Sequence, residues 1–287
     1  AGRETSFDLT IVRQEVKMNS VSLTTLFPDS TGYIKLDRFQ QGSSREVYNH
    51  IVELKEQGMQ RLIFDLRNNG GGYLQEAVQI ADLFLPRDRL VVFTAGRAVQ
   101  DTSKYFTEHD AQLQDEPLIV LVNGQSASAS EIIVGAVQDW DRGLVVGATT
   151  VGKGSVQQVV NIDDKVELKL TMAAWHTPSG RSIDKRMRKD STLVDGSAKE
   201  YKTRLLERLV RSGGGVNPDI EIHGRKGNRL YGQLNGFFTL NNQFFHYARG
   251  YHFKHPELTP DFVAGREDIA AFRAYAENRE FEYVSEA

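Results

Sequence analysis

The chain of 287 residues contains no cysteine. This absence excludes disulfide bonds, thiolate metal sites and a cysteine nucleophile, but it leaves the cellular compartment open. An excess of charge is also missing, because 35 Lys and Arg stand against 38 Asp and Glu, a formal net charge of −3. A protein with this charge balance lacks the excess of basic residues that is typical of nucleic-acid-binding proteins. We therefore expect no nucleic-acid partner.

Long hydrophobic runs are absent as well. The longest, such as residues 118–122, fall far short of the roughly 20 apolar residues of a membrane-spanning helix, so no transmembrane segment is expected. No signal peptide is expected in the first residues, since Arg3, Glu4 and Asp8 interrupt them, and a processed protein and an excised fragment fit equally well. Hydrophobic residues still make up 40% of the chain, enough for the core of one large or two ordinary domains.

Strands and helices alternate along most of the chain. The strands show apolar runs or period-two patterns, and the helices show apolar spacings of three and four. This order predicts an α/β fold with a buried sheet. Ser43 or Ser44 is expected to cap the first helix and Gly58 to end it. The predicted strands are 7–17, 32–37, 62–66, 117–122 and 144–147, and the predicted helices are 47–57, 73–85 and 126–140.

The next segments are less regular. Residues 155–162 and 166–175 alternate like a β-hairpin with a turn between them. The charged run 184–190 is expected to be a solvated loop. Residues 201–211 have a helical pattern, which Ser212 and the glycines after it end.

Residues 225–287 differ in composition and predict a helical C-terminal region, with two helices after Pro260. His252 and His255 form an H-x-x-H pattern, but without cysteines or suitably spaced carboxylates we interpret them as structural or solvated and expect no metal site. Paired phenylalanines are expected to fill a small core, and a subunit contact is an equal alternative. These pairs are Phe237 with Phe238 and Phe244 with Phe245.

A glycine triplet, residues 70–72, lies between a predicted strand and a predicted helix. It fits a tight turn that needs positive φ angles. It equally fits a backbone cradle whose N–H groups bind a negative oxygen. The triplet does not distinguish the two.

Residues 147–154 nearly match the phosphate-binding loop G-x-x-x-x-G-K-[ST]. That motif needs a hydroxyl directly after the lysine and then a helix. Gly154 occupies the hydroxyl position, and a predicted strand follows. The match therefore does not favour a nucleotide-binding enzyme.

Three serines, at positions 126, 128 and 130, lie at a strand-to-helix junction. Serine there is an ordinary helix cap, or a nucleophile if a base removes its proton. No histidine is near in sequence, but Lys153 lies in a loop between Gly152 and Gly154. A lysine acts as a base once its pKa falls from about 10.4 to about 7 or 8, which costs about 3.5–4.5 kcal/mol. Such a shift requires a packed pocket around the side chain.

Five ordered segments together resemble the carboxyl-terminal processing proteases, also called tail-specific proteases, which are S41 serine endopeptidases with a Ser–Lys dyad. The resemblance extends over about residues 5–222. The segments are LIFDLRNNGGG (62–72), VLVNGQSASASEIIVGAVQDWDRGLVVG (120–147), TVGKGSVQQ (150–158), TPSGRSI (177–183) and GGGVNPDI (213–220).

The resemblance implies a role for individual residues. The nucleophile falls on Ser128 and the lysine base on Lys153, 25 residues later. Gln157 corresponds to a glutamine that orients the lysine. The backbone N–H groups of Ala129 and Gly72 correspond to the oxyanion hole. Such a mechanism needs no metal, nucleotide or other cofactor.

Three more residues match family positions. Asp139 is expected to be structural, and Glu131 and Thr150 lie near the dyad with roles that the sequence does not define. The family fold implied here is a crotonase-like (ClpP/crotonase-type) twisted β-sheet spiral with helices around it and a helical C-terminal appendage.

The resemblance also implies a domain organisation. Residues 1–20 match the trailing strand of a PDZ module and its linker, residues 21–224 the catalytic core, and residues 225–287 the helical region. Most of the PDZ module is missing, so we expect a fragment of an exported, periplasmic or cell-envelope protein. The implied partners are proteins or peptides with unstructured, apolar C-termini, and an adaptor or a homo-oligomer stays open. The alternative function is a non-catalytic ligand-binding or scaffold protein on the same core.

Overall fold

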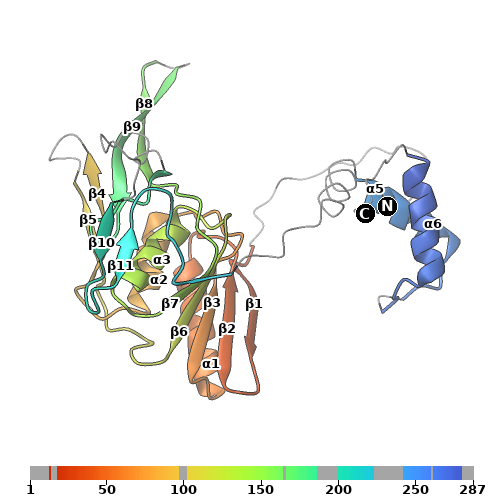
Figure 1. The fold of residues 1–287 in the computed structure, drawn as a ribbon, viewed down its shortest axis with the longest axis horizontal. Coiled ribbons are helices and arrows are strands. Elements are labelled where there is room, and N and C mark those ends of the chain that lie inside the picture. Colours follow the sequence, from red (N-terminus) through yellow and green to blue (C-terminus); the bar gives the residue numbers. More distant parts are fainter. Residues whose placement is uncertain are drawn as a thin grey trace. The chain divides into compact units, whose positions relative to one another are not determined.

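The computed structural model describes Arg13 and residues 18–96, 102–163, 166–185, 199–222, 242–259 and 261–279. The chain divides into two compact units, one of residues 16–222 and one of residues 1–15 with 223–287 (Figure 1). The strand predicted at residues 7–17 lies outside the described residues, except for Arg13. None of the helices in the described ranges is long and apolar enough to cross a membrane.

A six-stranded sheet in the order β1-β2-β3-β6-β7-β12 forms the centre of the larger unit. The first pair is antiparallel, and every later pair is parallel. This mixed sheet with helices confirms the predicted α/β class. The strands are β1 (Val21–Leu26), β2 (Thr31–Leu36), β3 (Arg61–Asp65), β6 (Leu118–Val122), β7 (Leu144–Gly147) and β12 (Ile220–Glu221).

Three helices cover this sheet: α1 (Ser43–Glu56), α2 (Leu74–Asp82) and α3 (Ala129–Asp139). Helices α2 and α3 lie side by side (Figure 1). All eleven residues of α3 are buried, because both apolar and small side chains occur all round this helix.

A second, four-stranded sheet has the order β5-β4-β9-β8 and is antiparallel throughout. Its last pair is the hairpin that the alternation at residues 155–175 predicts. The strands are β4 (Leu90–Gly96), β5 (Lys104–Phe106), β8 (Ser155–Asn161) and β9 (Glu167–His176).

The helix predicted at residues 201–211 is wrong. The segment forms a two-stranded hairpin of β10 (Glu200–Lys202) and β11 (Leu209–Arg211). The helical spacing of apolar residues suggests a helix that buries one face. The leucines at 205, 206 and 209 are instead 63%, 69% and 66% exposed, so they are not packed in a core. Asp141 accepts hydrogen bonds from the backbone of Leu205 and Leu206, and these bonds hold the loop between β10 and β11 in a non-helical conformation.

The start of α1 also differs from the prediction. Gly42 is the N-cap residue, with φ 88°, and Ser43 and Ser44 lie inside the helix. The Glu76 carboxylate from α2 accepts hydrogen bonds from the backbone of Gly42 at 2.7 Å and Ser44 at 2.8 Å. A side chain from another helix thus takes the place of the expected serine cap. The helix ends at Glu56, and its C-cap residue Gln57 is followed by Gly58 at φ 95°.

The predicted solvated loop at 184–190 is wrong at its first residue, because Asp184 is only 4% exposed. Residues 186–190 lie outside the described part of the chain.

In the smaller unit the described residues form α5 (Gln243–Lys254) and α6 (Arg266–Glu277). Of the two helices expected after Pro260, the described residues contain one, α6, and the other described helix, α5, precedes Pro260. Phe244 stacks on Phe272 with ring centroids 5.4 Å apart, but Phe244 and Phe245 are 47% and 58% exposed and fill no closed core. Phe237 and Phe238 lie outside the described residues.

Candidate active site

Ser128 lies in the sharp turn between β6 and α3, as the N-cap of the helix. Its backbone has φ 58° and ψ −115°, a conformation that L-residues rarely adopt. Such strain costs on the order of 1–3 kcal/mol and clusters at functional sites. It persists here because neighbouring groups fix the turn.

Hydrogen bonds of the other two serines, Ser126 and Ser130, hold this turn in place. Ser126 and Ser130 are both 0% exposed. The Ser126 hydroxyl donates to the Leu66 carbonyl at 2.8 Å, and the Ser130 hydroxyl donates to the Asn69 carbonyl at 3.0 Å. Ser128 is the one member of the triplet that is half-buried rather than buried. The structure thus separates two structural serines from one that is available for chemistry.

The glycine turn packs directly against Ser128. Gly71 has φ 96°, and a Cβ on it would lie 2.8 Å from the Ser128 Cβ and 2.9 Å from the Ala129 nitrogen. Gly72 has φ 153° and faces Phe39 instead, where a Cβ would lie 2.0 Å from the carbonyl oxygen. Both positions therefore require glycine, one for the contact with the serine turn and one for the contact with Phe39.

Buried Asn69 sets the shape of this turn. Its Nδ2 donates to the Leu36 carbonyl at 2.8 Å, and its Oδ1 accepts from the Gly71 N–H at 2.9 Å. The Gly71 N–H is thereby occupied. Among the described residues, no acceptor meets the N–H of Gly72 or that of Ala129, which opens α3 and so has no intrahelical partner. The sequence pattern pointed to Gly71 only as part of the glycine triplet and did not point to a role for Asn69.

Asp65 anchors the beginning of the same turn. It is 0% exposed and accepts from the Arg67 guanidinium at 2.6 Å and from the Tyr33 hydroxyl at 2.6 Å. Burial alone would raise the pKa of the Asp65 carboxyl, but the hydrogen bonds from Arg67 and Tyr33 outweigh it and lower that pKa. The carboxylate is therefore charged at neutral pH and holds Arg67 where the strand ends.

Glu131, in the first turn of α3, joins the serine turn to the lysine loop. Its carboxylate is 0% exposed. One oxygen accepts from the backbone N–H groups of Ser128 at 2.9 Å and Lys153 at 2.8 Å. The other accepts from the Thr150 hydroxyl at 2.5 Å and the Gly152 N–H at 2.7 Å. The backbone nitrogens of Ser128 and Lys153 are thus at most two hydrogen-bond lengths apart.

The spacing of Ser128 and Glu131 is that of a capping box, S-x-x-E, and this pattern could have suggested the role of Glu131 from the sequence. The bond to Lys153 could not be foreseen, because it joins residues 22 positions apart.

The side chains of Lys153 and Gln157 are both exposed. Gln157 lies on β8 opposite Thr171. The expectation of a packed pocket around the lysine is therefore not met by the described residues. The reason is that the loop is held through its backbone and its flanking glycines, which leaves the Lys153 side chain facing outward.

An open cleft of about 530 Å³ runs along the glycine turn. Gly71, which lines the cleft, also packs against Ser128, although Ser128 itself does not line the cleft. The cleft is lined by Asp37, Arg38, Phe39, Gln40, Asn68, Gly70, Gly71, Gly72 and Tyr73.

Comparison with known proteins gives a consistent result. Residues 30–193 match the model of peptidase family S41. A carboxyl-terminal-processing protease of Synechocystis sp. is 40% identical over 188 residues, which are 64% of this chain and 43% of that protein. Carboxyl-terminal-processing peptidase 3, chloroplastic, of Arabidopsis thaliana is 35% identical over 214 residues, which are 71% of this chain and 41% of that protein.

Among solved structures, the photosystem II D1 C-terminal processing protease superposes with a TM-score of 0.56 at 30% identity, over 74% of this chain and 50% of that one. The chain spans half or less of the length of each of these three proteins.

Proposed function

The chain belongs to peptidase family S41, and from this premise we propose that it is a serine endopeptidase that cleaves proteins near their C-termini with a Ser–Lys dyad. The observation that carries the proposal is the Glu131 carboxylate, whose one oxygen holds the backbone of both Ser128 and Lys153. The names of the relatives support the preference for C-termini.

In the proposed mechanism the neutral Lys153 amine takes the proton of the Ser128 hydroxyl, and the Ser128 oxygen attacks the peptide carbonyl carbon. The N–H groups of Gly72 and Ala129 receive the negative oxygen of the tetrahedral intermediate. The protonated Lys153 then returns its proton to the leaving amine, and water hydrolyses the acyl-enzyme by the same steps. Gln157 orients the lysine side chain.

The exposed Lys153 side chain adds one requirement. The proposed proton transfer between Ser128 and Lys153 takes place in a site from which water is excluded. We propose that the bound substrate, lying over the glycine turn, covers the lysine and supplies this exclusion.

The finer organisation is proposed in the same way. The sheets and helices of residues 21–224 are the catalytic core, of crotonase-like spiral type, and residues 225–287 are a separate helical region. Bacterial and chloroplast relatives support an exported or periplasmic protein that acts on unstructured, apolar C-termini, with an adaptor or a second copy as further partners.

The test is incubation of the chain with an unstructured protein that ends in apolar residues, followed by identification of fragments by mass spectrometry. Ser128→Ala and Lys153→Ala should each lower the cleavage rate by about 10³-fold or more. Lys169→Ala, which removes an exposed lysine from β9, is the matched control and should cleave at the parent rate. Substantial turnover by the Ser128 variant, or labelling of another residue by a fluorophosphonate, would overturn the dyad. A stable complex without cleavage would favour the binding role instead.

A further inference from the structure

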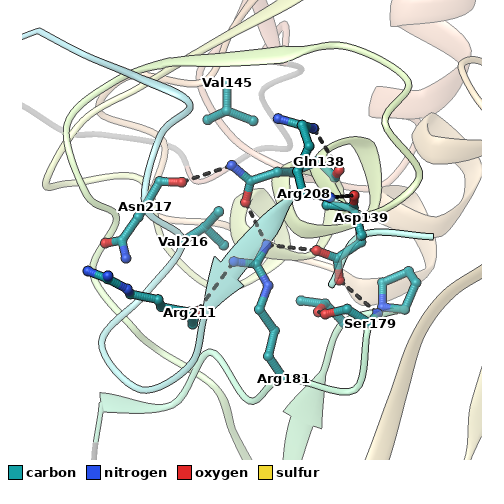
Figure 2. Close-up of polar contacts among 12 residues, drawn as sticks. Gln138, Asp139, Val145, Ser179, Arg181, Arg208, Arg211, Val216 and Asn217 are labelled. Carbon is teal, nitrogen blue, oxygen red and sulfur yellow. Dashed lines mark hydrogen bonds and ion pairs between the residues drawn. The ribbon is translucent and has the colours of Figure 1, made fainter. Parts of the chain in front are cut away.

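A buried polar cluster lies at the opposite end of α3 from Ser128 (Figure 2). At its centre is Arg181, 1% exposed, whose guanidinium lies 2.9 Å from the Asp139 carboxylate. Arg181 also donates to the Gln138 side-chain oxygen at 2.6 Å and to the Arg211 carbonyl at 3.3 Å. Asp139 is 0% exposed and accepts from the Ser179 N–H at 2.8 Å. The cluster thus joins the last turn of α3 to two later segments of the chain.

A buried ion pair of this kind is not explained by stability alone. Burial lowers the pKa of the Arg181 guanidinium, and the nearby Asp139 charge opposes that shift. Apolar side chains of similar volume often stabilise a protein as well as a buried ion pair does. What apolar side chains do not provide is the fixed direction of hydrogen bonds. The question for this cluster is therefore which parts of the chain its hydrogen bonds hold in position.

Asp184 and Lys185, three and four positions after Arg181, pack against the Lys153 loop. The Lys185 N–H donates to the Gly152 carbonyl at 3.0 Å. A Cβ on Gly154 would lie 2.7 Å from the Asp184 nitrogen. The loop therefore has no room to shift toward residues 184 and 185, and these residues, together with the Glu131 carboxylate, limit the position of Lys153.

A second connection reaches the same loop from the neighbouring turn of α3. Gln138 donates from its Nε2 to the Asn217 carbonyl at 2.9 Å (Figure 2). The adjacent Val216 donates its N–H to the Thr150 hydroxyl at 2.8 Å and accepts from the Thr150 N–H at 3.2 Å. Arg181 holds Gln138 in place through the side-chain oxygen. Arg181 therefore lies at the start of both connections, although Asp219 also accepts from the Gln138 Nε2 at 2.9 Å.

We propose that Arg181 is a positioning residue that fixes the Lys153 loop relative to Ser128 through the buried helix α3. The helix carries Ser128 and the Glu131 anchor of the loop at one end. At the other end, about 16 Å away at 1.5 Å per residue, Gln138 and Asp139 carry the two further connections to the loop. A catalytic constellation has to be held within about 0.5 Å, and a displacement of about 1 Å costs on the order of 10²-fold in rate. The inference rests on the proposed Ser–Lys function.

The test compares Arg181→Met with the double variant Arg181→Met/Asp139→Asn, which removes the stranded buried carboxylate as well. Arg211→Met is the matched control, because the Arg211 side chain is 63% exposed and only its carbonyl joins the cluster. For each variant, thermal unfolding, kcat and KM are measured. We expect the double variant to melt near the parent, with kcat about 10²-fold lower and KM unchanged, and the control to match the parent in all three.

The outcomes separate the two proposals. If the parent shows no cleavage that depends on Ser128, the proposed function fails. If the parent cleaves through Ser128 and the folded double variant has the parent's kcat, only the role of Arg181 is overturned. Arg181→Lys keeps the charge beside Asp139 but loses the forked donors, so it covers the case in which the methionine variants do not fold. Its kcat should fall about tenfold or more at unchanged KM, and a parent-like kcat would overturn the role of Arg181.

Discussion

Replacing Glu131 by glutamine is expected to loosen the lysine loop from the helix that begins at Ser128. Glutamine has nearly the shape of glutamate, but it presents an NH₂ group where one carboxylate oxygen was. Each oxygen of Glu131 accepts two hydrogen bonds. In the less costly orientation the NH₂ group faces Thr150 and Gly152. The Thr150 hydroxyl can then turn to accept, but the Gly152 N–H is left facing another donor.

The expected loss of stability follows from this count. A buried N–H without an acceptor costs about 1–3 kcal/mol. The three other hydrogen bonds lose their charge, which weakens each by about 1 kcal/mol. Removing a buried charge offsets part of the sum. We expect the free energy of unfolding to fall by about 2–4 kcal/mol, a large share of the 5–15 kcal/mol typical of a domain.

The assay is urea unfolding of Glu131→Gln together with its cleavage kinetics, each measured where the protein is folded. Because the Lys153 loop loses its anchor, kcat should fall by about 10²-fold. Glu56→Gln, at an exposed position near the end of α1, is the matched control and should behave like the parent in both assays. A Glu131→Gln protein with the stability and kcat of the parent would refute the role of this carboxylate.

Two further predictions concern the glycine turn and the start of α1. Gly71→Ala should abolish cleavage, because its Cβ would collide with Ser128, whereas Gly70→Ala should be tolerated, because nothing lies within 4 Å of the added carbon. Equal activity of the two variants in the peptide assay would contradict this geometry. Burial by itself would raise the pKa of Glu76, but the backbone hydrogen bonds, that of Gly42 first, outweigh it and lower this pKa below 4.5. The stability that the charged form contributes is therefore complete above pH 4.5 and is lost as the pH falls through the lower folded value. The difference in unfolding free energy between the parent and Glu76→Gln should be constant above pH 4.5 and shrink below it. A difference independent of pH would show that the charge of Glu76 does not stabilise the helix.

The local sequence pattern was sufficient to predict four strands of the main sheet. The strands predicted at 32–37, 62–66, 117–122 and 144–147 are confirmed. Residues 118–122 are a continuous apolar run, which is typical of a strand buried on both faces, whereas Lys35 and Asp65 interrupt the apolar pattern of two others. Local pattern failed at residues 201–211. There Asp141, about 60 positions away, decides the conformation through hydrogen bonds that no window of sequence contains.

The family and the order of the motifs follow from local pattern, because strand, turn and helix preferences are local and the glycine turn, candidate nucleophile and lysine occur in one fixed succession. The tertiary structure decided which groups hold them. It buried Ser126 and Ser130 and left Ser128 accessible, and it left the Lys153 side chain exposed. It also brought Glu131 to the lysine loop and Arg181 to the far end of α3. These contacts join residues 22 and about 40 positions apart, and a hydrogen bond between such residues depends on the path of the folded chain, which spacing along the sequence does not specify.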